Sequence, residues 1–290
     1  MPPPVSSSMQ SARQRLADQL RQIREDAGLT GRELARRARW KAGVSKVSRI
    51  EHGHRPISAA DLRTWCEVCG VPPERTEELL AEMRAVAGMW QTHRQLNRGG
   101  LKGRQERLRD EYWRVKLSRV YQTKVIPGLL QTSAMTTVYL TQARKEQHLA
   151  LDDVAAAVEA RMQRQECLKR PDARWLFCLE EDVLWYRPGP VEVHREQLRH
   201  LLSAMCRPTV SLGIIPRDID RRGVSPDESF TMVDTELVGV ELVSGTLTIT
   251  APDEIRLYAE AWDRLWSLAV HGEAARALIS EALEVLDRPR

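Results

Sequence analysis

Hydrophobic residues near the start of the chain recur three or four positions apart, the spacing that places them on one face of an α-helix. Leu16, Leu20 and Ile23 follow this spacing within residues 13–27. Gly28 comes directly afterwards, and glycine commonly ends a helix because it adopts the left-handed conformation without strain. We therefore expect the first helix over residues 13–27.

A second, shorter helix is predicted over residues 31–38. Thr30 precedes it and Glu33 follows three positions later, which is the sequence of a capping box. In a capping box, each of the two side chains accepts a hydrogen bond from the other residue's backbone amide. The positions that this helix would bury are Leu34, Ala35 and Ala38.

Residues 44–53 predict a third helix with two different faces. Val47 and Ile50, three positions apart, can point into a small core. The opposite face carries four side chains that can donate hydrogen bonds and have no negative charge: Ser45, Lys46, Ser48 and Arg49. A helix that enters the major groove of DNA needs such a face. A solvated amphipathic helix has the same pattern, so these ten residues alone leave both interpretations open.

The chain beyond the third helix predicts two more helices. Gly53 ends the third helix, and Pro56 prevents its continuation. Ser58 caps a fourth helix that Gly70 ends, and a long fifth helix is expected over residues 74–96. The apolar face of the fourth helix would consist of Leu62, Trp65, Cys66 and Cys69.

This order of elements resembles the helix-turn-helix domain of phage-repressor-like regulators of the xenobiotic-response-element type. The resemblance is carried by Arg24, Gly28, Leu29, Thr30, Leu34, Ala35, Val47, Ser48, Ile50, Glu51 and Gly53. It implies a sequence-specific regulator that binds double-stranded DNA as a dimer. The side chains expected to enter the major groove are Ser45, Lys46, Ser48 and Arg49. The phosphate contacts, partly at a helix N-terminus, would come from Thr30, Arg32, His54 and Arg55.

The connection before the third helix departs from this family pattern. Relatives usually have a shorter connection, such as Gly-Trp-Ser-x-Ser-Lys, whereas residues 39–45 here read Arg-Trp-Lys-Ala-Gly-Val-Ser. Gly43 stands where a serine N-cap is usual, and glycine lacks the side-chain acceptor. The sequence therefore leaves open where this helix begins, and whether Val44 or Ser45 leads into the groove.

Charge is distributed unevenly along the 290 residues, although the net charge is only +4. Residues 1–75 carry 14 Lys and Arg against 8 Asp and Glu, a net charge of +6. The remainder carries 30 against 32, a net charge of −2. The basic excess therefore belongs to the predicted helix-turn-helix part, where it can neutralise DNA phosphates and release counterions.

The pattern predicts two domains, a mainly α domain of five helices and then an α+β domain. We expect a disordered tail over residues 1–11, the DNA-binding domain with its long final helix over 12–96, and the α+β domain over 106–287. Three glycines and three basic residues predict a flexible linker over residues 97–105. Strands are expected over residues 117–125, 174–179, 209–215, 229–234, 237–243 and 246–250.

Two segments of the second domain carry a further resemblance. After Tyr-Gln at 121–122, residues 125–132 read Val-Ile-Pro-Gly-Leu-Leu-Gln-Thr, and residues 158–165 read Val-Glu-Ala-Arg-Met-Gln-Arg-Gln. Both are similar to segments of a large actinobacterial family of antitoxin-like regulators with a characteristic C-terminal domain. Ile126 stands where relatives usually have valine. The resemblance covers residues 16–283 and implies a small protein partner that is encoded nearby.

The second domain offers no recognisable catalytic motif. It contains no Gly-x-Ser-x-Gly, no phosphate-binding glycine loop and no His-Glu-x-x-His, and its lysines form no recognisable pair with a serine. We expect no enzyme activity, no cofactor and no metal. Cys66 and Cys69 have a zinc-type spacing, but they continue an apolar face and no second cysteine pair follows, so we interpret them as core residues.

Five aromatic residues of the second domain allow two interpretations: Trp175, Trp185, Tyr186, Trp262 and Trp266. They can pack in the core or in a dimer interface, or they can line a pocket for an effector. Two hypotheses for regulation therefore remain. The family resemblance favours a domain that docks a small protein partner, and the alternative is a one-component regulator that binds a small-molecule effector.

Membrane association is not expected, because the sequence has no run of 18 or more apolar residues. The first ten residues lack the positive n-region and the apolar h-region of a signal peptide. We therefore expect a cytoplasmic protein.

Overall fold

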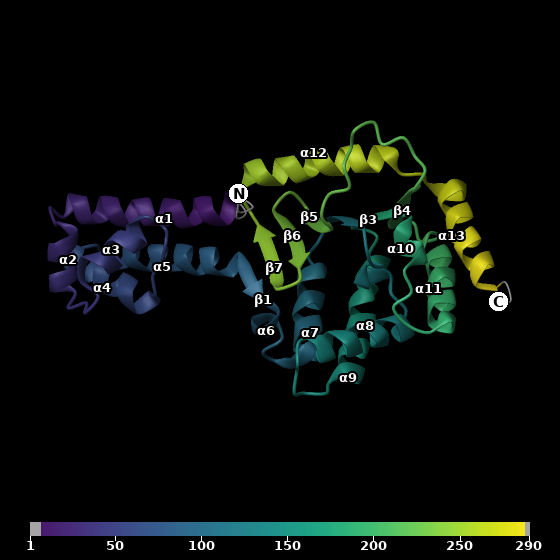
Figure 1. Ribbon diagram of the computed structural model, residues 1–290, viewed down its shortest axis with the longest axis horizontal. Coiled ribbons are helices and arrows are strands. Elements are labelled where there is room, and N and C mark those ends of the chain that lie inside the picture. Colours follow the sequence, from purple (N-terminus) through teal and green to yellow (C-terminus); the bar gives the residue numbers. More distant parts are fainter. Residues whose placement is uncertain (1–6, 288–290) are drawn as a thin grey trace. The chain divides into compact units, whose positions relative to one another are not determined.

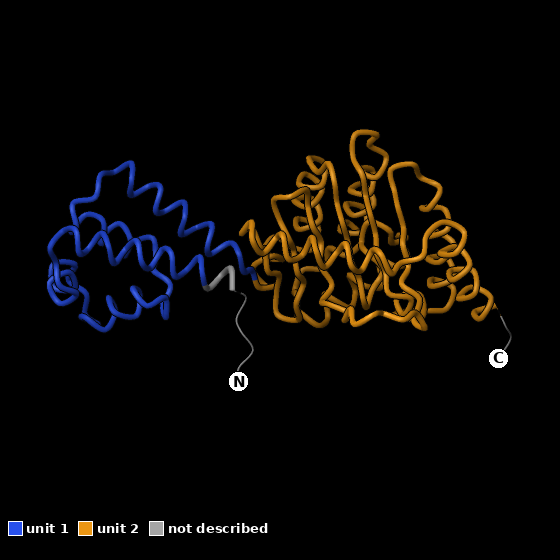
Figure 2. The backbone as a smooth tube through the Cα atoms, turned by 90° about the horizontal axis from the view of Figure 1, so that it is seen from above, with its two compact units in different colours: residues 1–91 blue, residues 92–290 orange. Residues whose placement is uncertain are grey.

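The computed structural model describes residues 7–287, which form two compact units (Figure 2). The first unit ends at Gln91 and the second begins at Thr92. Of the predicted disordered tail, residues 1–6 lie outside the described residues, whereas residues 7–11 belong to the first helix. No helix within the described range is long and apolar enough to cross a membrane.

The described part of the first unit is built from helices joined by turns and short loops. Its helices are α1 (Ser7–Asp26), α2 (Gly31–Arg37), α3 (Gly43–Glu51), α4 (Ala59–Cys69) and α5 (Pro73–Gly88). They surround one apolar core, in which Trp65 of α4 is fully buried. The indole N–H of Trp65 donates to the Leu20 carbonyl at 3.2 Å, so its burial leaves no polar atom unpaired and joins α4 to α1.

The structure contains the capping box that the sequence predicted at the start of α2. Thr30 Oγ1 accepts a hydrogen bond from the Glu33 amide at 3.2 Å, and the Glu33 carboxylate accepts one from the Thr30 amide at 2.8 Å. Gly28 ends α1 just before this capping box with a φ of +68°. These local signals set the short turn between α1 and α2, which is why the sequence predicted it correctly.

The second unit is built on a mixed sheet with the strand order β1-β7-β6-β5-β2-β3-β4. Its strands are β1 (Trp90–Thr92), β2 (Leu117–Gln122), β3 (Arg174–Glu180), β4 (Val210–Ile215), β5 (Phe230–Val233), β6 (Leu237–Leu242) and β7 (Gly245–Ile249). Strands β2, β3 and β4 run parallel, whereas the β2–β5, β5–β6 and β6–β7 pairs are antiparallel. The predicted α+β class and all six predicted strands are confirmed. The edge strand β1 lies where the long fifth helix was expected to continue.

Helices lie on both faces of this sheet (Figure 1). On one face, Tyr258 of α12 (Pro252–Leu268) packs edge-on against Phe230 of β5. On the other face, Tyr112 of α7 (Gly100–Tyr112) stacks on Trp175 of β3, with 5.8 Å between ring centroids. The other helices are α6 (His93–Leu96), α8 (Ser133–Glu146), α9 (Val154–Arg164), α10 (Asp182–Trp185), α11 (Val191–Ala204) and α13 (Gly272–Asp287), with short 3-10 segments at Gly128–Leu130 and Gln165–Lys169.

The predicted flexible linker over residues 97–105 is wrong, because α7 begins within it. The Asp153 carboxylate accepts hydrogen bonds from the amides of Leu101 and Lys102, at 3.2 and 2.9 Å, and so caps the start of α7. Leu101 and Gln105 of this helix are buried. The composition predicted flexibility because the capping carboxylate lies 52 residues along the chain and leaves no local signal.

We predict that Gly100→Ala destabilises the second unit by about 1–3 kcal/mol. Gly100 has a φ of +83°, and a Cβ there would overlap the Asp153 carboxylate. The adjacent Gly99 has a φ of −99° and open space around it, so Gly99→Ala is a matched control with little expected effect. Chemical denaturation, with hydrogen exchange of the α7 amides, measures both variants. Equal stability of the two would contradict the capping role of Asp153.

Candidate nucleic-acid interface

Helix α3 separates its buried and exposed faces as the spacing predicted. Val47 and Ile50 are 1% and 3% exposed and pack in the core of the first unit. Ser45, Ser48 and Arg49 are exposed. Arg49 makes one intramolecular hydrogen bond, from Nε to the Ser45 carbonyl at 3.2 Å, and its terminal nitrogens remain available.

The start of α3, which the sequence left open, lies at Gly43. Gly43 has a φ of +54°, a conformation that other residues adopt only with strain. No side chain caps the helix at Ala42, and the Ser45 hydroxyl instead donates to the Ala42 carbonyl at 2.8 Å. Val44 therefore belongs to the first turn, where its side chain is 51% exposed. Of the two residues between which the sequence left the choice open, Val44 is therefore the one that lies nearer the start of the helix.

Lys46 does not share the free face of α3. Its ammonium forms an ion pair with Asp61 of α4 at 2.5 Å and lies 4.2 Å above the centre of the Trp40 ring. The Lys46 side chain is only 12% exposed. This lysine therefore joins α3 to α4, and its charge is already compensated within the unit.

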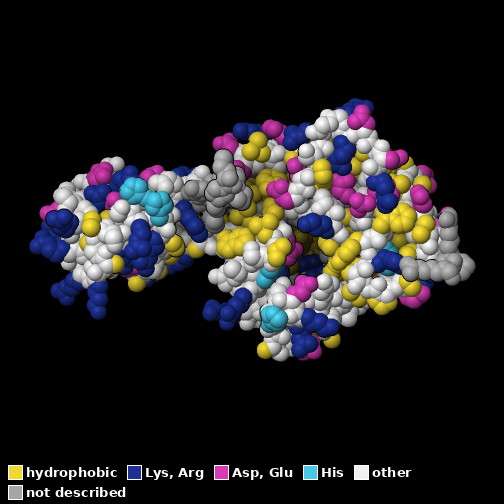
Figure 3. Space-filling model, viewed as in Figure 1, with side chains coloured by type: hydrophobic (Ala, Val, Ile, Leu, Met, Phe, Trp, Pro, Cys, Tyr) yellow, Lys and Arg dark blue, Asp and Glu magenta, His cyan; other side chains and the backbone are white. Residues whose placement is uncertain are grey.

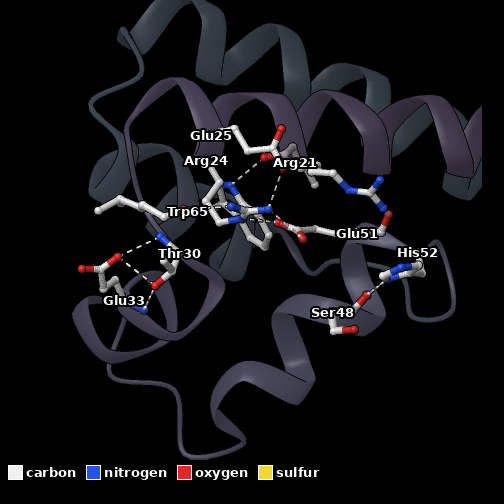
Figure 4. A network of polar contacts seen from close by, with 11 residues as sticks. Arg21, Arg24, Glu25, Thr30, Glu33, Ser48, Glu51, His52 and Trp65 are labelled. Carbon is white, nitrogen blue, oxygen red and sulfur yellow. Dashed lines mark hydrogen bonds and ion pairs between the residues drawn. The ribbon is translucent and has the colours of Figure 1, made fainter.

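A buried ion pair joins α3 to α1 (Figure 4). Arg24 Nε and Nη2 donate to the two carboxylate oxygens of Glu51, at 2.5 and 3.1 Å. The side chains are 12% and 9% exposed. Arg24 also donates to the Leu29 carbonyl at 2.8 Å, and Arg21 donates to the Glu51 carbonyl at 2.8 Å. Arginine offers this two-pronged geometry and lysine does not, so the pair fixes the C-terminal end of α3 against α1.

The residues expected to contact phosphates differ in how free they are. Arg32, His54 and Arg55 are exposed, and the Arg55 amide donates to the Arg49 carbonyl at 3.0 Å, which holds this turn beside the end of α3. The Thr30 hydroxyl is occupied, because it donates to Glu33 at 2.8 Å within the capping box. His52, which the sequence did not single out, stacks on His54 with 5.9 Å between ring centroids.

Basic side chains gather on the part of the first unit that α2, α3 and α4 form (Figure 3). None of those exposed around α3 forms an ion pair with another described residue. They are Arg32, Arg36, Arg37, Arg39, Lys41, Arg49 and Arg55. Arg36, Arg37, Arg39 and Lys41 were missed, although four basic residues within six positions were a visible signal.

The five aromatic residues, for which the sequence allowed either packing or a pocket, have different surroundings in the second unit. Trp175 is fully buried in the core, Trp262 stacks on Trp266 along α12, and Trp185 donates to Glu181. Tyr186 is 48% exposed at the surface. Apart from Trp262 and Trp266, which share α12, these residues lie in different parts of the second unit. Periodicity and aromatic character alone could therefore not distinguish a shared cavity from ordinary burial.

The fold of the first unit and its free basic face define a DNA-binding protein of the helix-turn-helix class. Residues 15–79 match the model of a helix-turn-helix domain. Residues 114–281, more than half of the chain, match a domain of unknown function (DUF5753). The chain therefore belongs to the DUF5753 family, and its helix-turn-helix match supports a DNA-binding regulator.

Other comparisons add little. No curated protein sequence matches this chain. Among solved structures, the archaeal chromatin protein TrmBL2, described as showing a novel mode of DNA binding, is similar with 11% identity and a TM-score of 0.33. The similarity covers 84% of this chain and 88% of that one. At so low a TM-score it supports no statement about this protein.

We predict that Glu51→Gln destabilises the first unit by roughly 3 kcal/mol, because it leaves the largely buried Arg24 with only the exposed Glu25 as a carboxylate partner. Glu25→Gln is the matched control, since Glu25 contacts the same arginine at 3.2 Å but is 51% exposed. An exposed pair contributes less than about 1 kcal/mol. Urea denaturation of both variants tests this, and an equally small effect of the two would contradict the bracing role of Glu51.

Proposed function

We propose that this protein is a sequence-specific transcription regulator that places α3 in the major groove of DNA. The observation that carries the proposal is the free face of Ser45, Ser48 and Arg49, held on a buried core and surrounded by unpaired basic side chains. Hydrogen-bond donors on a rigid helix can read base edges, and unpaired cations around it can neutralise phosphates.

The proposed contacts fall into two groups. Arg49, Ser45 and Ser48 read base edges, and the exposed Val44 at the leading turn is suited to a thymine methyl group. The phosphate contacts come from Arg32, Arg36, Arg37, His54 and Arg55, with the amides at the start of α2 near Thr30. Lys46, originally expected in the groove, is a positioning residue because Asp61 already holds its ammonium.

The regulator is proposed to act as a dimer in the cytoplasm. Dimers of helix-turn-helix domains bind two half-sites about one helical turn apart, which makes the operator a near-palindrome. The second unit would dock a small protein partner, as the resemblance to antitoxin-like actinobacterial regulators implies. Repression would follow where an operator overlaps a promoter. Chromatin immunoprecipitation with sequencing would return the operator and the regulated genes together.

A one-component regulator with a small-molecule effector is the second candidate. Of the five aromatic residues, Trp175 is fully buried in the core and Trp262 stacks on Trp266. Two neighbouring arginines of α9 favour it instead: Arg164 is buried, Arg161 is partly exposed, and neither has a carboxylate partner among the described residues.

We predict that Arg49→Ala weakens operator binding roughly 5- to 150-fold, which corresponds to about 1–3 kcal/mol for a base-reading arginine. The same variant should relax the sequence preference at one position of each half-site. Arg84→Ala on α5, another exposed arginine without an ion pair, is the control. Fluorescence anisotropy with the operator and with single-base variants measures both; wild-type affinity and preference in Arg49→Ala would refute base reading.

We further predict that Lys46→Met lowers the stability of the first unit without changing the selected DNA sequence. The substitution removes the Asp61 ion pair and keeps much of the packing on Trp40. Selection of binding sites from a random DNA pool, carried out with the variant and with the wild type, shows whether the preferred DNA sequence changes. A changed consensus sequence would restore Lys46 as a base-reading residue.

A further inference from the structure

The two motif segments of the second unit are held together by glutamine side chains. Gln165 donates from Nε2 to the carbonyls of Gly128 and Gln131, at 3.1 and 2.7 Å. Arg161 donates from Nη1 to Gln131 Oε1 at 2.6 Å. The 3-10 turn at Gly128–Leu130 therefore rests on the end of α9, where two arginines converge on one glycine: a Cβ at Gly128 would lie 3.0 Å from Arg164 Nη2 and 3.5 Å from Arg161 Nη1.

These two arginines have only neutral hydrogen-bond acceptors. Gln105 Oε1 accepts from Arg164 Nη1 at 3.0 Å and from Arg161 Nε at 3.2 Å, and Gln131 Oε1 accepts the remaining bond. No carboxylate of the described residues lies within ion-pair distance of either guanidinium. Arg164 is 5% exposed, and Arg161 is partly exposed. Buried charges in proteins are normally paired, so an uncompensated pair of like charges requires an explanation.

The nearby charged groups do not supply the missing anion. Burial, together with the like charges of Arg164 and Arg104, lowers the pKa of Arg161 to about 9. Glu241 and Glu111 exert a weaker opposite influence from a distance, and Glu241 is already paired with Arg104 at 3.2 Å. The Arg164 guanidinium lies 5.3 Å from the centre of the Tyr112 ring. Such a cation–π contact stabilises the positive charge but does not neutralise it.

Unpartnered donors lie in the same region. Arg164 Nε is buried and has no hydrogen-bond partner among the described residues, and neither has the indole nitrogen of Trp175. Trp175 stacks on Tyr112, the ring over which Arg164 lies. Both groups can only donate hydrogen bonds, so what they lack is an acceptor. A water molecule can accept one such bond, but it cannot compensate two positive charges.

We propose that Arg161 and Arg164 bind a small oxyanion, a carboxylate or a phosphate group of a small molecule. The planar guanidinium matches both groups with paired hydrogen bonds. An anion can reach the site from solvent at Arg161, because this side chain is partly exposed. Arg164 contributes a second positive charge that is buried. The site lies entirely in the second unit, so it stands independently of the DNA contacts proposed for α3, and it gives the effector of the second candidate function a chemical class.

The first test compares the thermal stability of the full chain in phosphate, succinate and chloride at equal ionic strength. At saturation, phosphate or succinate should raise the wild-type Tm by about 3 °C or more over chloride. Arg161→Gln, which keeps a hydrogen-bonding side chain, should lose most of that shift. Arg109→Gln on α7 is the control and should keep it, because the Arg109 side chain is 39% exposed and pairs with the Asp110 carboxylate. Whether phosphate or succinate gives the larger shift identifies the group that the site prefers.

The second test places an anion in the site permanently. Gln105→Glu is nearly isosteric and puts a carboxylate where both arginines already donate. Its Tm in chloride should exceed that of the wild type, and its response to phosphate and succinate should fall. This variant gains stability on the proposal, so a failure to fold cannot be mistaken for support.

Two results overturn the proposal. One is the absence of an anion-specific shift in the wild type, and the other is an undiminished shift in Arg161→Gln. Arg49→Ala tests whether the anions bind at the basic face of the first unit instead. On the proposal, this variant loses operator affinity but keeps the full anion-induced rise in Tm. The anion site and the DNA-reading face can therefore fail separately.

Discussion

The buried ion pair between Arg24 and Glu51 is the constraint on which the proposed DNA-reading surface depends. It joins the last turn of α1 to the last residue of α3, while Val47 and Ile50 hold the other face of α3 in the core. Lys46 and Asp61 add a second tie, to α4. A helix held from three sides presents Ser45, Ser48 and Arg49 in one fixed direction, and such rigidity is what recognition of base edges requires.

Charge is used differently in the two units. Around α3 the exposed arginines lack partners, which costs little in water and leaves them free for phosphates. In the second unit, Arg161 and Arg164 also lack carboxylates, but Arg161 is only partly exposed and Arg164 is buried, where an uncompensated charge is expensive. The first arrangement suits a polyanion that covers a surface, and the second suits a small anion that enters the fold.

The sequence predicted those features whose causes are local. The capping box of Thr30 and Glu33, the glycine after α1 and the alternating strands of the second unit all follow from neighbouring residues. The features that it missed depend on distant partners. Asp153 turns a glycine-rich segment into the start of α7, and Asp61 removes Lys46 from the free face of α3. The glutamine bridges between the two motif segments were likewise invisible, although the segments themselves stood out.

The central claim, that α3 lies in the major groove, is tested most directly by photo-crosslinking of the full chain to its operator. A photoreactive phenylalanine derivative would replace Ser45 in one variant and Glu77, an exposed residue of α5, in another. The account predicts crosslinks from position 45 to specific bases within each half-site, and none from position 77. Crosslinks from position 77 alone, or crosslinks from position 45 without base preference, would contradict it.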